Sequence, residues 1–123
     1  MEKELNIIQM EKLYMKVIGL MINLKFEGNG KEFFEDGEYY IGQYKNGLRH
    51  GKGIEYYSNG NIKYKGNFVN DEKNGIGHYI SEIGEYYIGQ FKINFKHGKG
   101  TLYLPNGKIK QEGKWLYDIF NAN

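Results

Sequence analysis

The sequence predicts an all-β fold made of stacked β-hairpin repeats. The first observation is a series of Gly-x-Gly pairs beginning at residues 28, 51, 75 and 98, with spacings of 23, 24 and 23 residues. The second is that 17 of the 18 glycines fall on the same lattice, Gly47 being the exception. A constant period of this length indicates units that cannot bury an apolar face alone and therefore stack on their neighbours.

Each unit is expected to be a hairpin. The runs between glycines are about seven residues long, which is too short for a helix and typical of a strand. They are rich in β-branched and aromatic residues, which favour strands. The predicted strands cover residues 38–44, 63–68 and 85–91 and residues 51–57, 75–80 and 98–104.

The dipeptides Asp36-Gly37, Asn59-Gly60 and Asn106-Gly107 are typical of two-residue hairpin turns, because these residue types tolerate left-handed backbone. We therefore expect the tight turns at these positions. The extra residue of the 24-residue spacing falls in the same part of the unit. We expect it to be one additional turn residue.

Three segments carry a family resemblance. They are Tyr40-Ile-Gly42-Gln-Tyr44, Tyr64-Lys-Gly66-Asn-Phe68 and Tyr87-Ile-Gly89-Gln-Phe91, and in each a Gly-x-Gly pair begins nine residues after the central glycine. In this arrangement the sequence resembles the MORN repeat, the membrane occupation and recognition nexus. The resemblance implies an elongated, single-layer, twisted antiparallel sheet.

The repeat phase divides the chain into segments. Residues 40–63, 64–86 and 87–110 are predicted to be clear units, and residues 111–123 a closing half unit and tail. Residues 17–39 are interpreted as a degenerate first unit, in which Val17 and Met21 stand where aromatic residues are expected. Residues 1–16 are expected to be a short capping helix or a loose segment.

The most apolar stretch covers residues 13–24. About twelve residues are too few to cross a bilayer, which needs about 20. One interpretation is an amphipathic helix lying at a membrane interface. The other, which the repeat phase favours, is that Val17-Ile18-Gly19 begins the first strand of the degenerate unit.

Composition adds further limits. A length of 123 residues allows one domain, and the mean hydropathy of −0.69 is typical of a soluble chain. There are no cysteines, which excludes disulfides and thiolate sites. The acidic N-terminus lacks the basic flank of a signal peptide. We therefore expect a cytoplasmic protein that associates with membrane or cytoskeleton only peripherally.

Enzymatic function is not expected. The Gly-x-Gly pairs do not continue as phosphate-binding loops. The hydroxyl residues Ser58, Ser81 and Thr101 have no spacing to a histidine that would suggest a catalytic triad. No catalytic residue, metal site or cofactor is predicted, and a formal net charge of only +2 argues against nucleic acid as a partner.

Aromatic residues fall in columns when the units are superposed. Residues two apart in a strand share a face, so an aromatic pair brackets each repeat glycine. For Tyr40, Tyr64 and Tyr87 the favoured interpretation is that the rings form the core, because cross-strand aromatic pairs stabilise a sheet. A single layer is nevertheless expected to leave part of this stripe exposed as a groove that binds a partner. The predicted groove consists of Tyr40, Tyr44, Tyr56, Tyr64, Phe68, Tyr87, Phe91, Tyr103 and Trp115.

Basic residues also fall in columns and predict a ridge at one end of the hairpins. Such a ridge suits anionic lipid headgroups or an acidic partner, although a solvated edge that prevents edge pairing is an equal alternative. The predicted ridge consists of Arg49, Lys52, Lys73, Lys96 and Lys99.

Three functions are therefore considered. The first is a non-enzymatic scaffold whose aromatic groove holds a helix or extended segment of a partner, or a second copy, as the family resemblance implies. The second is peripheral binding of acidic phospholipids through the basic ridge. The third is an antitoxin-like binding protein, because residues 56–64 and 105–113 partly resemble a second, bacterial type of MORN repeat.

Overall fold

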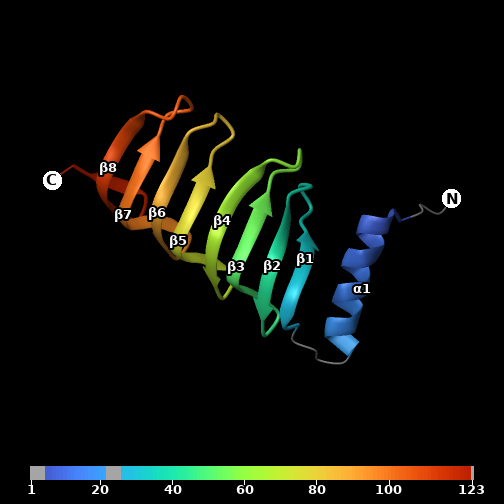
Figure 1. Ribbon diagram of the computed structural model, residues 1–123. Coiled ribbons are helices and arrows are strands. Elements are labelled where there is room, and N and C mark those ends of the chain that lie inside the picture. Colours follow the sequence, from blue (N-terminus) through green and yellow to red (C-terminus); the bar gives the residue numbers. More distant parts are fainter. Residues whose placement is uncertain (1–4, 22–25, 123) are drawn as a thin grey trace.

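The computed structural model describes residues 5–21 and 26–122, which form one helix and one open sheet. Helix α1 is Ile7–Met21. The strands are β1 Gly28–Phe33, β2 Tyr39–Lys45, β3 Leu48–Tyr56, β4 Ile62–Val69, β5 Glu72–Ile80, β6 Tyr86–Lys92, β7 Phe95–Tyr103, β8 Ile109–Leu116 and β9 Ile119–Asn121. They pair antiparallel in chain order, in a single row with α1 beside β1 (Figure 1). The predicted single-layer sheet of stacked hairpins is confirmed.

Helix α1 occupies the place of the strand expected at Val17, so that prediction is wrong. Asn6 explains where the helix begins, because its Oδ1 accepts a hydrogen bond from Gln9 N at 2.7 Å while Gln9 Oε1 accepts one from Asn6 N at 3.1 Å. This reciprocal pair is a capping box, and no glycine or proline follows it before Gly19. Residues 1–4 and 22–25, which belong to the predicted cap and degenerate unit, lie outside the described residues.

The two-residue turns lie at the opposite end of the hairpins from the predicted end. They are Asn46-Gly47, Asn70-Asp71, Ile93-Asn94 and Tyr117-Asp118, and both residues of each turn have positive φ. The predicted dipeptides instead belong to three-residue turns; in one of them Tyr57 N donates to Asn61 O at 2.8 Å across residues 58–60. Only the glycine has positive φ there. The prediction was wrong because Asn-Gly also fits a type I turn followed by a left-handed glycine.

The extra residue of the 24-residue spacing is a β-bulge, not an additional turn residue. Pairing between β3 and β4 passes from Glu55↔Tyr64 to Tyr56↔Ile62, so Lys63 is the bulged residue. Lys110 is bulged in the same way between β7 and β8. The hairpins β1–β2 and β5–β6 keep a regular register. A bulge and a turn insertion give the same glycine spacing, which is why the sequence did not separate them.

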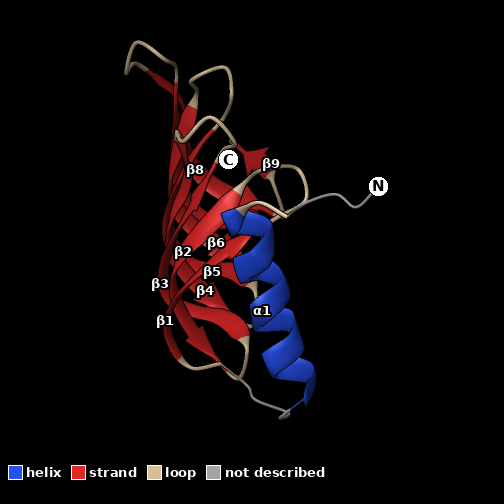
Figure 2. Ribbon diagram, turned by 90° about the vertical axis from the view of Figure 1, so that its right-hand side faces the viewer, coloured by secondary structure: helices blue, strands red, loops and turns tan. Residues whose placement is uncertain are grey.

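The core is a ladder of aromatic rings along one face of the sheet. Its buried members are Tyr40, Tyr64, Phe68, Tyr87, Phe91 and Trp115. Each tyrosine contacts the next aromatic ring of its own strand and the ring of the following repeat edge to face, with centroids 5.1 to 5.4 Å apart. The strands are bowed, with α1 and β9 on the inner side of the bow (Figure 2). Since Phe120 of β9 packs on Trp115, the ladder also lies on the inner side.

Candidate functional site

Alternation along the strands gives the sheet two chemically different faces. The aromatic face holds the ring ladder and the residues in register with it, such as Glu55 opposite Tyr40. We call the other face the lysine face. Its basic residues are Lys31, Lys45, Lys52, Lys65, Lys92, Lys99 and Lys114, and its acidic residues are Glu72 and Glu112.

Most of the predicted aromatic groove is core rather than surface. Six of its nine residues are the buried members of the ring ladder. Neighbouring repeats cover one another edge to face, so the single layer seals its own aromatic stripe. Tyr44 is half-buried at the N-terminal end of the ladder, where its hydroxyl donates to Glu32 Oε1 at 3.0 Å. Burial and the Glu32 carboxylate raise the pKa of Tyr44.

The remaining two residues, Tyr56 and Tyr103, lie on the lysine face. Tyr56 stacks on Tyr39 with ring centroids 4.6 Å apart, and Tyr103 stacks on Tyr86 at 4.8 Å. All four rings are half-buried. The nine predicted groove residues are thus divided between two faces and do not form one continuous site.

The tyrosines of the ladder also explain the repeat glycines. Gly66 and Gly77 face each other across β4 and β5, and the Tyr64 ring lies over this pair. Tyr64 Oη donates to Asn67 O at 2.9 Å, and Tyr40 and Tyr87 make the same bond three residues ahead of them. Burial raises the pKa of Tyr40 and of Tyr87 to about 12. The ring position is therefore set by the fold and is closed to a ligand.

The predicted basic ridge is also divided between the faces. Arg49 lies over the Tyr40 and Phe68 rings. Lys73 lies over the Tyr64 ring, and Lys96 lies over the Tyr87 and Trp115 rings. Lys52 and Lys99 lie on the lysine face. Positions 49 and 52 are three residues apart, so strand alternation places them on opposite faces. The single ridge was therefore a wrong prediction.

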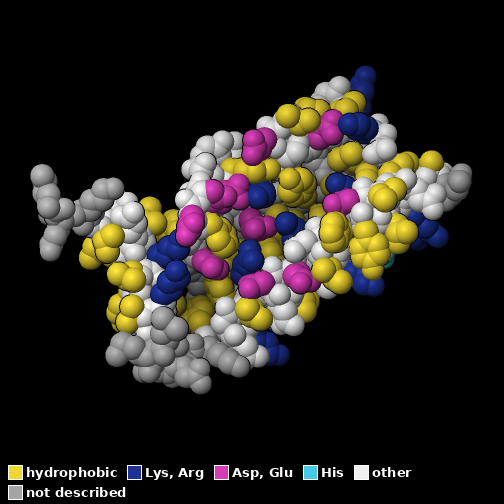
Figure 3. Space-filling model, turned by 180° about the vertical axis from the view of Figure 1, so that it is seen from behind, with side chains coloured by type: hydrophobic (Ala, Val, Ile, Leu, Met, Phe, Trp, Pro, Cys, Tyr) yellow, Lys and Arg dark blue, Asp and Glu magenta, His cyan; other side chains and the backbone are white. Residues whose placement is uncertain are grey.

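The ion pairs found among the described residues lie on the aromatic face or in its turns. Glu55 bridges Arg49 and Lys73 at 3.4 Å each, and Arg49 Nε reaches Asp71 Oδ1 at 3.2 Å. The bulged Lys63 reaches Glu38 at 2.7 Å. Figure 3 looks onto this face and shows basic and acidic side chains alternating over the hydrophobic ones. Its charges are thus largely satisfied within the chain.

The lysine face has the opposite character. Lys52, Lys65, Lys99 and Lys114 are exposed, and none of them belongs to an ion pair with another described residue. Large apolar side chains are exposed between them, including Ile76 at 57%. His78 lies opposite Lys65, and burial together with the Lys65 charge lowers the pKa of its imidazole. A basic and partly apolar surface is therefore left uncovered by the described chain.

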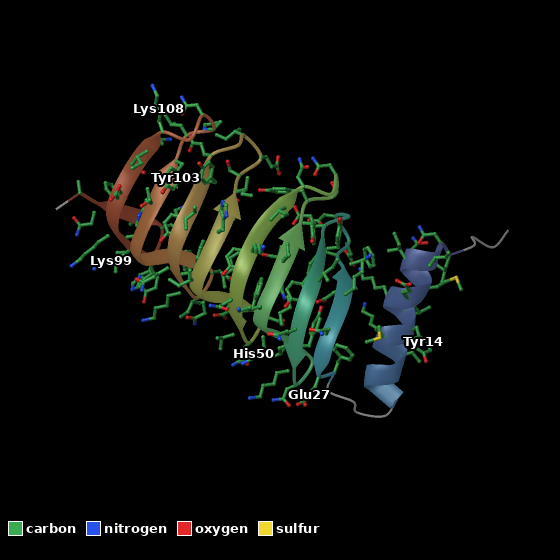
Figure 4. All side chains as sticks on the ribbon, viewed as in Figure 1. Tyr14, Glu27, His50, Lys99, Tyr103 and Lys108 are labelled. Atoms are coloured by element: carbon green, nitrogen blue, oxygen red, sulfur yellow. The ribbon has the colours of Figure 1, made fainter. Side chains whose placement is uncertain are left out.

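A cleft lies between α1 and the first strands. It is an open cleft of about 800 Å³, lined by Tyr14 and Met15 of α1, by Phe26, and by Gly30 and Tyr44 of the sheet. The side chain of Tyr14 is itself 65% exposed; Figure 4 labels this residue on the helix. The surface of the cleft is mostly apolar.

Residues 5–21 and 26–122 contain neither a metal site nor a membrane-spanning helix. No group of three or more His, Asp or Glu side chains lies close enough to hold a metal ion. No helix there is long and apolar enough to cross a membrane.

The sequence prediction did not include several basic residues of the lysine face. Lys31, Lys65 and Lys114 share the lysine face with Lys52 and Lys99 but lie outside the columns that were singled out. Counting residues from each repeat glycine and sorting them by parity would have grouped them, because side chains two apart point the same way. The bulges at Lys63 and Lys110 give no such signal.

Comparison with known proteins agrees with the repeat geometry. A family model described as MORN repeat matches residues 40–62, 64–86 and 87–109. No curated protein matches the chain. MORN repeats indicate a repeat-based module for protein interaction or membrane association, and the family is generally non-enzymatic. With three consecutive matches over strands β2 to β7, the chain belongs to the MORN-repeat family.

Proposed function

We propose that this chain is a non-enzymatic scaffold that binds a segment of a partner protein on its lysine face. The observation that supports this most is the set of exposed apolar side chains on that face. They include Ile41, Ile76 and Ile88, of which 41%, 57% and 42% is exposed. Ile41 and Ile88 hold equivalent positions on β2 and β6, with Ile54, Lys65 and His78 in register between them, and Ile76 lies in the neighbouring row. Exposed apolar side chains on several strands offer apolar area to a partner without loss of the core.

The aromatic groove is a weaker candidate. A partner that contacted the rings of Tyr64 or Phe91 would have to open edge-to-face pairs that stabilise the fold. Half-buried Tyr56 and Tyr103 are the members of the predicted groove that a partner could contact at low cost. Tyr56 lies opposite Tyr39, which is two residues from Ile41, and Tyr103 lies opposite Tyr86, which is two residues from Ile88.

The lipid alternative also has less support than the scaffold. Of the five residues predicted to bind lipid headgroups, Arg49, Lys73 and Lys96 are in ion pairs within the chain. Breaking those pairs would offset much of the gain from anionic headgroups. Neutralisation of a toxin, as in antitoxin-like proteins, would be one particular case of partner binding on the same face.

The test uses two matched substitutions. Ile88→Glu places a charge in the middle of the lysine face, whereas Ile83→Glu makes the same chemical change at an exposed turn residue. We expect Ile88→Glu to reduce recovery of the partner at least tenfold in a quantitative pull-down from the native cell. Ile83→Glu is expected to leave recovery unchanged, with both variants folded by circular dichroism. Equal recovery by the wild type and Ile88→Glu would disprove binding on this face.

A further inference from the structure

The lysine face carries seven basic side chains against two acidic ones, and two of the basic residues are direct cross-strand neighbours. Lys99 and Lys114 lie directly opposite each other on β7 and β8. Like charges in direct cross-strand register are destabilising. On the aromatic face, by contrast, the charges alternate in sign and pair. An anionic ligand on the lysine face would remove this repulsion.

One row of this face has a regular pattern. Lys52 of β3 and Lys99 of β7 hold equivalent positions, and Ile76 of β5 holds the same position midway between them. A glutamine fixes each lysine position, because Gln43 Oε1 accepts from Lys52 N and Gln90 Oε1 accepts from Lys99 N, both at 2.8 Å. The row therefore reads basic, apolar, basic. Figure 4 labels Lys99 well away from Lys108, which lies at a hairpin turn.

The spacing of this row matches one kind of polypeptide. Adjacent strands are about 4.8 Å apart, so neighbouring positions of the row, two strands apart, are separated by about 9.6 Å. A polyproline II segment repeats every three residues with a rise of about 3.1 Å per residue, or about 9.3 Å per turn. Side chains at i, i+3 and i+6 of such a segment would therefore meet Lys52, Ile76 and Lys99 in turn.

We propose that the lysine face binds an acidic segment in the polyproline II conformation, with Asp or Glu at i and i+6 and an apolar residue at i+3. This inference rests on the proposed scaffold function and specifies the chemistry of its partner. The two carboxylates pair with the Lys52 and Lys99 ammonium groups. The apolar side chain packs on Ile76. The segment runs across the strands, and Lys65 and Lys114 flank its path.

The probe is a fluorescent peptide with Glu at positions i and i+6, Leu at i+3 and proline between them. A second peptide of the same composition has the glutamates adjacent. Fluorescence anisotropy measures binding to the full chain at low and physiological salt. We expect the spaced peptide to bind at least fivefold more tightly than the rearranged one. Equal affinity would overturn the proposed spacing, and no binding of either peptide would overturn the proposal entirely.

Matched protein variants test the site. Lys52→Glu with Lys99→Glu should weaken the spaced peptide at least tenfold. Lys12→Glu in α1 with Lys108→Glu beside a hairpin turn makes the same change in net charge and should alter affinity less than twofold. As a control for folding, both double variants must have the same circular dichroism spectrum and melting temperature as the wild type. If the two double variants lose affinity equally, the interaction is only nonspecific attraction and the proposed site is wrong.

Vesicles containing phosphatidylserine test whether the lysine face binds anionic lipid instead of the peptide. The proposal expects them to compete poorly with the peptide at physiological salt. If the wild type floats with these vesicles but binds neither peptide, and the Lys52→Glu, Lys99→Glu double variant no longer floats, the lysine face binds lipid instead. The scaffold function is judged separately: if that variant still recovers the cellular partner and Ile88→Glu does not, the scaffold stands and the acidic segment is wrong.

Discussion

At the scale of single residues, the fold depends on a tyrosine lying over a pair of cross-strand glycines. Tyr40, Tyr64 and Tyr87 are fully buried although nothing but one layer of sheet surrounds them. Each ring rests where any side chain on the glycine would otherwise stand, so the strand glycines are required by close approach. Residue identity and sheet architecture are therefore coupled at these positions.

Substitution of a covered glycine should destabilise the sheet. A Cβ at Gly77 would lie only 2.6 Å from Tyr64 Cζ, and the fully buried ring has no room to withdraw. We expect Gly77→Ala to lower the free energy of unfolding by about 1–3 kcal/mol, measured by urea denaturation. In a Tyr64→Leu background the same change should cost less, because the clash is removed. An unchanged urea midpoint in Gly77→Ala would contradict this.

Alkaline pH should weaken the fold through the same tyrosines. The unfolded chain releases the Tyr40 and Tyr87 protons near pH 10, whereas the folded protein holds them until about pH 12. Their contribution is therefore complete below pH 10 and is lost as the pH rises from 10 to 12, at about 1.4 kcal/mol per unit of pKa difference. Urea midpoints between pH 9 and 12 measure this loss. Tyr87→Phe should make it shallower, and Tyr14→Phe in the exposed part of α1 should not.

At the scale of elements, the tight turns connect each hairpin to the preceding one. Asp71 N donates to Arg49 O at 2.9 Å, and Asp71 Oδ1 accepts from Arg49 N at 2.7 Å. Asn94 and Asp118 make the same two bonds to the residues 21 and 22 positions before them. Turn chemistry thus serves stacking as well as chain reversal. This role accounts for an Asn or Asp as the second turn residue.

The first turn residue offers a way to stabilise the protein. Ile93 has a φ of 49°, a left-handed conformation that a β-branched residue tolerates poorly, and it is 46% exposed. Asn70 occupies the equivalent position with a φ of 49°. Ile93→Asn should therefore raise the free energy of unfolding by about 1 kcal/mol. Ile76→Asn, in an extended strand, serves as the control and should give no gain; equal effects of both changes in urea denaturation would refute the strain argument.

At the scale of the whole molecule, stability is local and passes from neighbour to neighbour. Each strand contacts the strands beside it, and the ring ladder is continued from one repeat to the next. The ladder ends at Tyr44 and Phe26 on one side and at Trp115 and Phe120 on the other. Helix α1 contributes no ring to it. The two ends should therefore differ in what they add to stability.

Two truncations test this difference. Removal of residues 1–24 keeps Phe26 and the whole ladder, so we expect loss of helical circular dichroism with a change in unfolding free energy below about 1 kcal/mol. Removal of residues 111–123 takes away Trp115, which packs on Tyr87, and should cost several times more. A large loss on removing α1, or none on removing the C-terminal strands, would show that stability is not distributed in this way.

The sequence by itself determined the repeat, the hairpins, the antiparallel single-layer sheet and the family. Glycine spacing and strand composition are local properties, and a linear repeat carries them directly into a linear fold. The capping box of Asn6 and Gln9 was also readable and would have indicated a helix where a strand was expected at Val17. The alternation of Arg49 and Lys52 was readable in the same way.

Only the tertiary structure decided which aromatic residues are core and where the charges lie. Burial of the Tyr64 ring depends on the Phe91 ring of the following repeat and on the bow of the sheet, neither of which has a local signal. The bulge at Lys63 likewise depends on pairing between strands. The proposed binding surface is therefore the lysine face and not the predicted aromatic groove. The rings of neighbouring repeats cover one another on the aromatic face, which leaves the other face available to partners.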